Sequence, residues 1–309
     1  MRILRHERDR GFRSPVVALG NFDGLHRGHK AILARTIELA GETGGDPVVF
    51  TFYPHPISVV APERAPGQIT SLAERMRGLR SLGAAGVILQ RFTPAFAAVE
   101  AEAFLRDVIV GQLGASGIVA GFDVTFGHGR QGTPELLESL GPQLGLRVGI
   151  VSPVAGESGK VSSSAIRRAL AVGDVEEAGR LLGRLHRVFG TVREGDRRGA
   201  TIGFPTANIL PYGGLLPPDG VYAVRVKLQG DADALPAVAN LGTNPTFGGV
   251  GRRLEVHLFD FDRDLYGSRI EVGFAHRLRG EIRFPSVEEL VAQIEADAAQ
   301  ARALLRADS

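Results

Sequence analysis

Two histidines three residues apart, His26 and His29, lie in the glycine-rich segment Gly20–His29. The segment follows the apolar run Val16–Leu19 and precedes apolar residues at helical spacing, so we expect a strand, a turn and a helix. The first N–H groups of a helix lack partners within it and carry a partial positive charge, which suits them to hold phosphate. Donors fixed there would stabilise the charge that builds up when ATP reacts at its α-phosphate.

The residue types alone leave other interpretations of these histidines open. They could be surface residues or helix caps, and histidine also binds zinc, although no third ligand is evident nearby. A Walker phosphate loop around Gly159-Lys160 is rejected. That loop needs Gly five residues before Gly159 and Ser or Thr directly after Lys160, and this chain has Val154 and Val161 there. The chain has no cysteine, which excludes thiolate metal sites, disulfides and cysteine nucleophiles.

A second group of polar residues is the run Ser162–Ser164 followed by Arg167. Three hydroxyls at the start of a helix could cap it or bind phosphate, and an arginine one turn later can reach the same anion. A well-capped helix with a surface arginine explains these residues equally well.

The C-terminal half carries a third group, in which Thr206 and Asn208 follow two glycines and Glu255 stands two residues before His257. In an extended segment Thr206 and Asn208 point to the same side, which suits shared coordination of a magnesium–phosphate unit. Glu255 could act as a general base toward an attacking hydroxyl. The alternatives are a turn followed by a strand, and a solvated strand face.

The first half of the chain alternates apolar runs with amphipathic segments, which predicts a parallel sheet with helices on both faces. The expected strands are 16–19, 48–52, 87–89, 118–120 and 146–151, and the expected helices are 29–40, 71–82, 102–113 and 133–144. Ligands bind beyond the C-terminal ends of such strands. The loops 20–29, 51–56 and 121–132 fall there, so we expect them to converge.

Near residue 184 the alternation of strand-like and helix-like segments gives way to short strand-like runs. A helical pair at 162–171 and 174–182 closes the first half, and the expected strands that follow are 188–192, 221–226, 237–241, 254–259 and 270–274. Turn clusters separate these runs, and a helix at 286–305 begins with the capping pattern of Ser286. We therefore expect an α/β chain with a Rossmann-like domain at 1–183 and a small antiparallel barrel with a C-terminal helix at 184–309.

Composition limits the classes of partner. The 309 residues suffice for two cores, and the net charge of +2 contains no block of like charge that would form a nucleic-acid groove. No apolar run approaches the roughly 18 residues that cross a bilayer, and the N-terminus is too charged for a signal peptide. We expect a cytoplasmic protein with no nucleic-acid or membrane partner.

The N-terminal motifs together resemble the adenylyltransferase module of the bacterial bifunctional riboflavin kinase/FAD synthetases, members of the His-x-Gly-His nucleotidyltransferase superfamily. The motifs that carry the resemblance are 20–29, 53–56, 121–127 and 163–167. It implies catalytic roles for His26, His29 and Arg167. It also implies nucleotide or flavin contacts for Gly20, Asn21, Phe22, Asp23, Gly24, His55, Asp123, Ser163 and Ser164. The family usually has Thr where this chain has Ser164. Serine also carries a hydroxyl, so the group is retained.

The C-terminal motifs resemble the riboflavin kinase module of the same family. They are 199–208, 220–223, 240–242, 245–247, Glu255 and 265–267. The resemblance implies that Thr206 and Asn208 bind magnesium and ATP, that Glu255 is the catalytic base, and that Gly203, Pro205 and Asn240 bind cofactor. Family members often carry Arg at the position of Ala200, and Arg197 or Arg198 could supply that charge here.

The combined resemblance implies an enzyme with two reactions. Riboflavin would be phosphorylated to FMN by MgATP in the C-terminal domain, and FMN would be adenylylated to FAD, with release of pyrophosphate, in the N-terminal domain. The sequence leaves the oligomeric state open, and a weak or transient homo-oligomer is compatible with it. The alternatives are an adenylyltransferase for another acceptor, such as nicotinamide mononucleotide or phosphopantetheine, and a flavin- or nucleotide-sensing regulator. The regulator is disfavoured because the catalytic groups are present.

Overall fold

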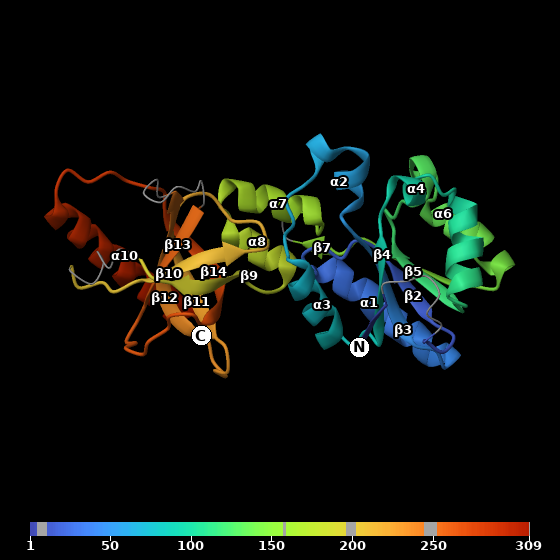
Figure 1. The fold of residues 1–309 in the computed structure, drawn as a ribbon, viewed down its shortest axis with the longest axis horizontal. Helices are drawn as coiled ribbons and strands as arrows, with labels where there is room; N and C mark the ends of the chain where they lie inside the picture. The colour runs from blue at the N-terminus through green and yellow to red at the C-terminus, as the bar shows by residue number, and fades with distance from the viewer. Residues whose placement is uncertain (5–10, 157–158, 196–201, 244–251, 309) are drawn as a thin grey trace. The chain divides into compact units, whose positions relative to one another are not determined.

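A computed structural model describes residues 1–4, 11–156, 159–195, 202–243 and 252–308 (Figure 1). Packing divides the chain into two compact units, Met1–Gly67 with Leu72–Ser162, and Gln68–Ser71 with Ser163–Ser309. This division precedes helix α7 (Ser163–Val172), whereas the domain boundary expected from the sequence follows helix α8 (Val175–Leu182). The boundary between residues 183 and 184 stays a prediction.

A six-stranded sheet in the order β1–β4–β3–β2–β5–β6 forms the centre of the first unit, and every pair in it is parallel. The strands are β1 (Arg2–Leu4), β2 (Val16–Leu19), β3 (Pro47–Tyr53), β4 (Gly86–Arg91), β5 (Gly117–Gly121) and β6 (Arg147–Val151). The predicted parallel sheet is confirmed. The three-residue strand β1 is too short to give a periodic signal and was not predicted.

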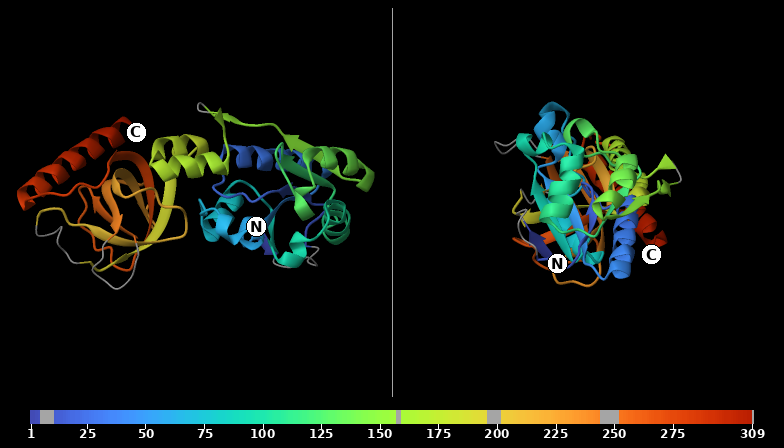
Figure 2. Two further views of the ribbon diagram at one scale, coloured as in Figure 1. Left: turned by 90° about the horizontal axis from the view of Figure 1, so that it is seen from above. Right: turned by 90° about the vertical axis from the view of Figure 1, so that its right-hand side faces the viewer.

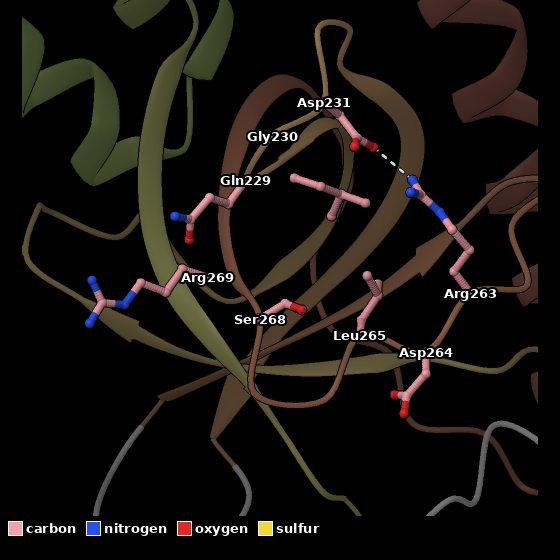
Figure 3. A pocket seen from close by; sticks show the side chains of 9 residues that line it. Gln229, Gly230, Asp231, Arg263, Asp264, Leu265, Ser268 and Arg269 are labelled. Carbon is pink, nitrogen blue, oxygen red and sulfur yellow. Dashed lines mark hydrogen bonds and ion pairs between the residues drawn. The ribbon is translucent and has the colours of Figure 1, made fainter.

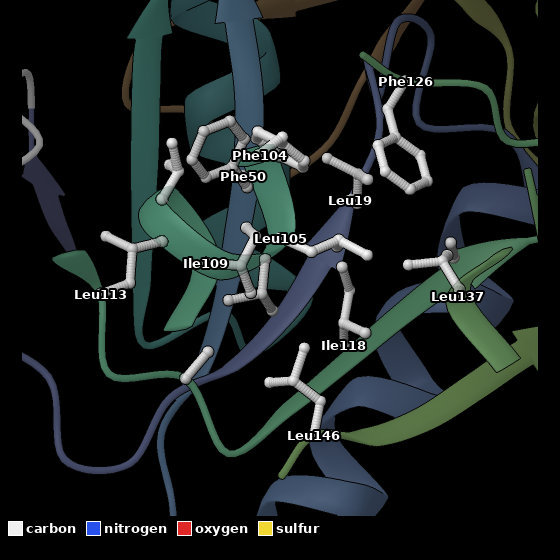
Figure 4. Packing of buried hydrophobic residues seen from close by; sticks show 14 of the residues in the cluster. Leu19, Phe50, Phe104, Leu105, Ile109, Leu113, Ile118, Phe126, Leu137 and Leu146 are labelled. Atoms are coloured by element: carbon white, nitrogen blue, oxygen red, sulfur yellow. The ribbon is translucent and has the colours of Figure 1, made fainter. Parts of the chain in front are cut away.

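Alternate residues of the central strands pack against helices on opposite faces of the sheet. The helical elements are α1 (Arg27–Thr43), α3 (Leu72–Ser81), η2 (Phe104–Gln112) and α6 (Pro134–Leu140). In β2, Val16 and Ala18 pack in a cluster with α1 and α3, whereas Val17 and Leu19 pack in a second cluster with η2 and α6. Figure 4 shows the second cluster around Phe50. Burial of both faces explains why these strands are continuous apolar runs.

One predicted helix of this unit differs in detail. The segment expected as a helix at 102–113 is a short turn, α5 (Ala101–Ala103), that continues as the π-helix η2. At its C-terminal end the Leu113 N–H donates to the carbonyl of Val108, five residues earlier, at 3.1 Å, which is the spacing of a π-helix. Apolar periodicity does not distinguish the two helix types over so few turns.

The second unit contains a closed antiparallel barrel in the strand order β10–β13–β12–β11–β14–β9. Its strands are β9 (His186–Arg193), β10 (Ala207–Tyr212), β11 (Gly220–Leu228), β12 (Leu235–Thr243), β13 (Arg252–Leu258) and β14 (Arg269–Arg279). The predicted barrel is confirmed. Strand β10 was not among the expected strands, because Asn208 and Pro211 are poor strand formers, but it matches the alternative interpretation of this segment as a turn followed by a strand.

The C-terminal helix α10 (Val287–Ala307) lies along the outside of the barrel (Figure 2). Its Ala298, Ala301 and Leu305 pack with Val221 and Val238 in one apolar cluster. The Ser286 side chain accepts a hydrogen bond from the N–H of Glu289 at 3.2 Å, which confirms the predicted cap.

A partly buried ion pair also links this helix to the barrel. Arg279 donates to both carboxylate oxygens of Asp297, with its shortest contact at 2.7 Å, and Gln293 donates to the same carboxylate. Helix α8 packs on the barrel at strand β14, where His276 contacts Glu176 at 3.2 Å. No helix in the described part of the chain is long and apolar enough to cross a membrane.

Two candidate active sites

His26 is the N-terminal cap of helix α1. Its Nδ1 accepts a hydrogen bond from the N–H of His29 at 3.3 Å, so the proton of the neutral His26 ring is on Nε2. The two imidazole rings stack with centroids 3.6 Å apart at 18°. A Cβ at Gly28 would lie 3.1 Å from His26 Cε1, so glycine leaves room for the buried ring. The capping role and a phosphate-binding role are therefore compatible in one residue.

The turn before His26 is held in an unusual backbone conformation. Phe22 and Leu25 have φ values of +52° and +49°, which residues other than glycine rarely adopt. The carbonyl of Asn21 accepts hydrogen bonds from the Thr51 hydroxyl at 3.1 Å and from Arg75 at 3.0 Å. These bonds from β3 and α3 fix the turn.

Two buried side chains of this turn differ in their environment. Asp23 forms an ion pair with Arg75 at 3.5 Å, and both side chains are almost fully buried. The Oδ1 atom of Asn21 is buried and has no hydrogen-bond partner among the described residues. A buried acceptor without a donor is costly in a folded protein, so Asn21 is placed to accept from a ligand.

The other motif loops of the first unit follow the strands on either side of β2. His55, after β3, caps helix α2 (Pro56–Val60), and its Nδ1 accepts from the N–H of Ile57 at 3.3 Å. Asp123, after β5, forms an ion pair with Lys160 at 2.7 Å. Because β3, β2 and β5 are neighbours, all three loops leave the same edge of the sheet at its centre.

Sequence analysis missed two features of this edge. Lys160, which was considered only as part of a Walker loop, lies 4.0 Å from the centre of the Phe122 ring as well as beside Asp123. The large apolar side chains Ile57 and Val60 of α2 are exposed. Their position directly after the 53–56 motif was the signal that could have found them.

The serine-rich motif begins helix α7 in the second unit. Ser163 and Ser164 lie in the first turn, and Arg167 follows one turn later. Ile166 between them is fully buried and anchors the helix, whereas Ser164 is exposed. The first two turns of α7 therefore carry hydroxyl and guanidinium groups of the kind that bind an anion.

Three predicted residues of the second site lie in one row across the barrel. Asn208 of β10 is directly opposite Glu255 of β13, and Glu255 is directly opposite Asn240 of β12. Directly opposite residues share a face, with Cβ atoms about 5 Å apart. Leu254 and Val256 are fully buried inside the barrel, so Glu255 and its row neighbours lie on the outer face.

Arg193 extends this row on its other side. It is exposed on β9, directly opposite Asn208. Sequence analysis missed Arg193 because only the strand register relates it to Asn208. At Gly195, two residues later, a Cβ would collide with the amide of Asn208, so a larger residue there would displace that side chain.

The segment Gly203–Thr206 enters strand β10 beside the row. Gly203 has a φ of +88°, a conformation suited to glycine. The ring of Phe204 lies 5.4 Å from that of His257, and His257 contacts the Pro205 carbonyl at 2.8 Å. Thr206 follows directly, one residue before the strand begins.

The donors expected to bind magnesium are a hydroxyl and an amide. Thr206 and Asn208 offer neutral oxygen atoms, and none of the described residues form a cluster of three or more His, Asp or Glu that could hold a metal. Mg²⁺ prefers few protein ligands together with phosphate oxygens, so these residues fit a magnesium ion that arrives with ATP. Arg197, Arg198, Ala200 and the segment 245–247 lie outside the described residues.

A cavity of about 530 Å³ opens between the loops that follow β11 and β13 (Figure 3). The ion pair between Asp231 and Arg263, at 2.6 Å, spans its rim. None of the predicted site residues lines this cavity. The Tyr222 hydroxyl inside the barrel donates to the Pro218 carbonyl at 2.7 Å, and burial raises the pKa of Tyr222.

Comparison with known proteins assigns a family to each half of the chain. The FAD synthetase family matches residues 10–165, and the riboflavin kinase family matches residues 182–305. Most of the helices α7 and α8 falls between the two matched segments.

Relatives match nearly the whole chain. A protein of Escherichia coli K12 named bifunctional riboflavin kinase/FMN adenylyltransferase is 40% identical over 287 residues, which are 93% of this chain and 91% of the relative. Proteins of the same name from Haemophilus influenzae and Bacillus subtilis are 36% and 38% identical, and they cover 98% and 93% of this chain and 99% and 91% of their own length. A crystal structure named as a macrolide-efflux protein from Streptococcus pneumoniae has a TM-score of 0.86 and 38% identity, and covers 96% of each chain.

Proposed function

We propose which side chains carry out the two reactions of this chain, which belongs to the family of bifunctional riboflavin kinase/FMN adenylyltransferases. The chain has riboflavin kinase and FMN adenylyltransferase activities, with the FAD synthetase part N-terminal and the kinase part C-terminal. The observation that supports the residue assignment best is the row of Asn208, Glu255 and Asn240 on the outer face of the barrel. It brings a carboxylate next to the amide of the nucleotide-binding motif.

In the kinase reaction, Glu255 accepts the proton of the riboflavin 5′-hydroxyl. The hydroxyl oxygen then forms a bond to the γ-phosphorus of ATP, and the bond between that phosphorus and the departing ADP oxygen breaks. Thr206 and Asn208 would hold a magnesium ion together with the phosphates of ATP, and the ion would supply positive charge that neutralises those phosphates. Arg193 stands beside Asn208 and adds positive charge to the same place.

In the adenylyltransferase reaction, a phosphate oxygen of FMN attacks the α-phosphorus of ATP, and pyrophosphate leaves. The FMN phosphate is already ionised, so positioning and charge stabilisation supply the catalysis. His26, His29 and the N–H groups that begin α1 bind the phosphates, and Asn21 accepts from the nucleotide. The hydroxyls of Ser163 and Ser164 and the guanidinium of Arg167, at the start of α7, are further phosphate-binding groups for this reaction.

His55 and Asp123 line the FMN side of the adenylyltransferase site. The exposed apolar side chains of Ile57 and Val60 follow His55 and offer a surface of the kind that a flavin ring covers. Lys160, paired with Asp123, brings a positive charge to the edge of the sheet where two phosphate-bearing substrates must meet.

A time course with riboflavin and MgATP tests this function, with FMN and FAD separated by chromatography. FMN should appear first and FAD should follow, and chelation of magnesium by EDTA should stop both. Nicotinamide mononucleotide and phosphopantetheine, supplied in place of riboflavin, should not be adenylylated. Adenylylation of either compound without FAD formation would support a different acceptor and overturn the assignment.

A further inference from the structure

His257 makes a hydrogen bond whose direction follows from the chemistry of its partner. Its Nδ1 lies 2.8 Å from the carbonyl oxygen of Pro205. A carbonyl only accepts, so Nδ1 must carry a proton and donate it. The ring is also enclosed by edge-to-face contacts with Phe204 at 5.4 Å and Phe259 at 5.8 Å, which fix its orientation.

The hydrogen bond connects two parts of the kinase site that are distant in sequence. His257 lies two residues after Glu255 on the same outer face of β13, and Pro205 directly precedes Thr206. The strand that carries the proposed base is therefore tied to the segment that carries the proposed magnesium ligand. A shift of Pro205 would move Thr206 with it, because the two residues share a peptide bond.

We propose that His257 is a positioning residue of the riboflavin kinase reaction. Its hydrogen bond holds the Pro205–Thr206 segment against strand β13, next to Glu255. This inference rests on the proposed roles of Thr206 and Glu255. The bond forms in both charge states of the imidazole, since Nδ1 carries a proton in the neutral tautomer that donates to Pro205 and in the cation. His257 therefore does not act as a base through Nδ1, although it lies only two residues after Glu255 on β13.

Charged groups around His257 do not replace its hydrogen bond. Asp260, three residues later, is held by two hydrogen bonds from Arg302 of α10, and these bonds lower the pKa of Asp260. Arg302 also lies 4.2 Å from the centre of the Phe259 ring, on which His257 packs. Arg302 and Asp260 thus stabilise the position of the Phe259 ring, whereas His257 alone of these residues donates to Pro205.

Two substitutions separate donation from other roles of the ring. In His257→Asn the amide nitrogen takes the place of Nδ1 and can still donate to Pro205, whereas His257→Leu keeps bulk and removes the donor. The full-length variants are assayed for riboflavin phosphorylation with MgATP and riboflavin varied separately. Thermal unfolding of the barrel serves as the control for folding, and FAD formation from supplied FMN serves as the control for enzyme concentration. His276→Asn is the matched histidine variant on the far side of the barrel.

The His257→Leu variant should raise KM for MgATP about threefold to tenfold, the range that one hydrogen bond corresponds to, with KM for riboflavin and kcat changed less than twofold. The His257→Asn variant should be close to wild type, and the pH dependence of kcat should be the same in both. Equal effects of Asn and Leu, no effect of Leu, or a hundredfold loss of kcat in His257→Asn would each overturn the proposal.

A parallel assay of Glu255→Gln separates this inference from the proposed site. If Glu255→Gln keeps full kinase activity, the site assignment is wrong whatever His257 does. If Glu255→Gln is inactive and the His257 variants behave like wild type, only the positioning role fails. Should His257→Leu unfold, His257→Gln replaces it, because its amide lies one bond farther along and cannot donate from the Nδ1 position.

Discussion

At the scale of single residues, His26 combines a structural and a chemical role. Its Nδ1 caps helix α1 and its ring stacks on His29, so truncation to alanine removes both at once. An asparagine at this position caps well but brings no imidazole. The two roles can therefore be separated by comparing two substitutions.

We expect His26→Ala to lower the free energy of unfolding of the first unit by about 1 kcal/mol, the usual value of a cap. His26→Asn should recover most of that loss, yet FAD formation should fall by at least about a hundredfold in both variants, because a fixed donor to the developing charge is lost in each. Denaturant unfolding and the rate of FAD formation from FMN measure the two effects. Full activity of His26→Asn would reduce His26 to a cap.

Tyr222 gives a pH-dependent prediction. Its side chain is fully buried, and burial raises the pKa of its hydroxyl above the value of about 10 that it has in the unfolded chain. The unfolded chain therefore loses this proton first as the pH rises. The contribution to stability is complete below pH 10 and is lost as the pH rises through the folded-state pKa.

The Tyr222→Phe variant should remove that alkaline loss. At neutral pH it should cost about 1 kcal/mol, because the Pro218 carbonyl loses its donor at 2.7 Å. Unfolding free energies of the two proteins, measured from pH 8 to 11, should converge at the alkaline end. Parallel curves over the whole range would contradict the assigned role of Tyr222.

At the scale of elements, the turn between β2 and α1 depends on α3. Arg75 of α3 donates to the Asn21 carbonyl and pairs with Asp23 in a nearly water-free environment. Removal of one partner from a buried ion pair leaves the other charge uncompensated, at a cost of about 3–5 kcal/mol.

The Arg75→Met variant should accordingly destabilise the first unit by about that amount and raise KM for ATP in FAD formation. Phosphorylation of riboflavin should persist, since the barrel is a separate compact unit. Arg35→Ala is the matched control, because its exposed pairs with Glu38 and Glu42 are worth only about 0–1 kcal/mol. Equal thermal shifts in the two variants would contradict the proposed importance of burial.

The elements themselves were largely predictable from sequence. Apolar runs covered on both faces identify the central parallel strands, and the Ser286 cap locates the last helix. Strand β10 was not predictable from propensity, because pairing with β9 and β13 overrides the preferences of Asn208 and Pro211. The π-helical geometry of η2 depends likewise on packing and not on the spacing of its apolar residues.

At the scale of the whole molecule, the sequence identifies which residues belong to the candidate sites, but it does not show how they are arranged in space. The motifs name Asn208, Glu255 and Asn240, but only the register of the barrel shows that they form one row, and only that register adds Arg193. Similarly, no pattern in the sequence relates Arg75 to the turn that carries His26. Long-range pairing determines these contacts, and a single sequence does not encode it in local periodicity.

The central claim for the whole molecule is that one chain carries two separate active sites, with His29 needed for one and Glu255 for the other. The most direct measurement follows FMN and FAD made by His29→Ala and Glu255→Gln, each from riboflavin and from supplied FMN, with MgATP. His29→Ala should make FMN but no FAD, Glu255→Gln should make FAD only from supplied FMN, and a mixture of the two should make FAD from riboflavin. Loss of both activities in either folded variant would contradict the account.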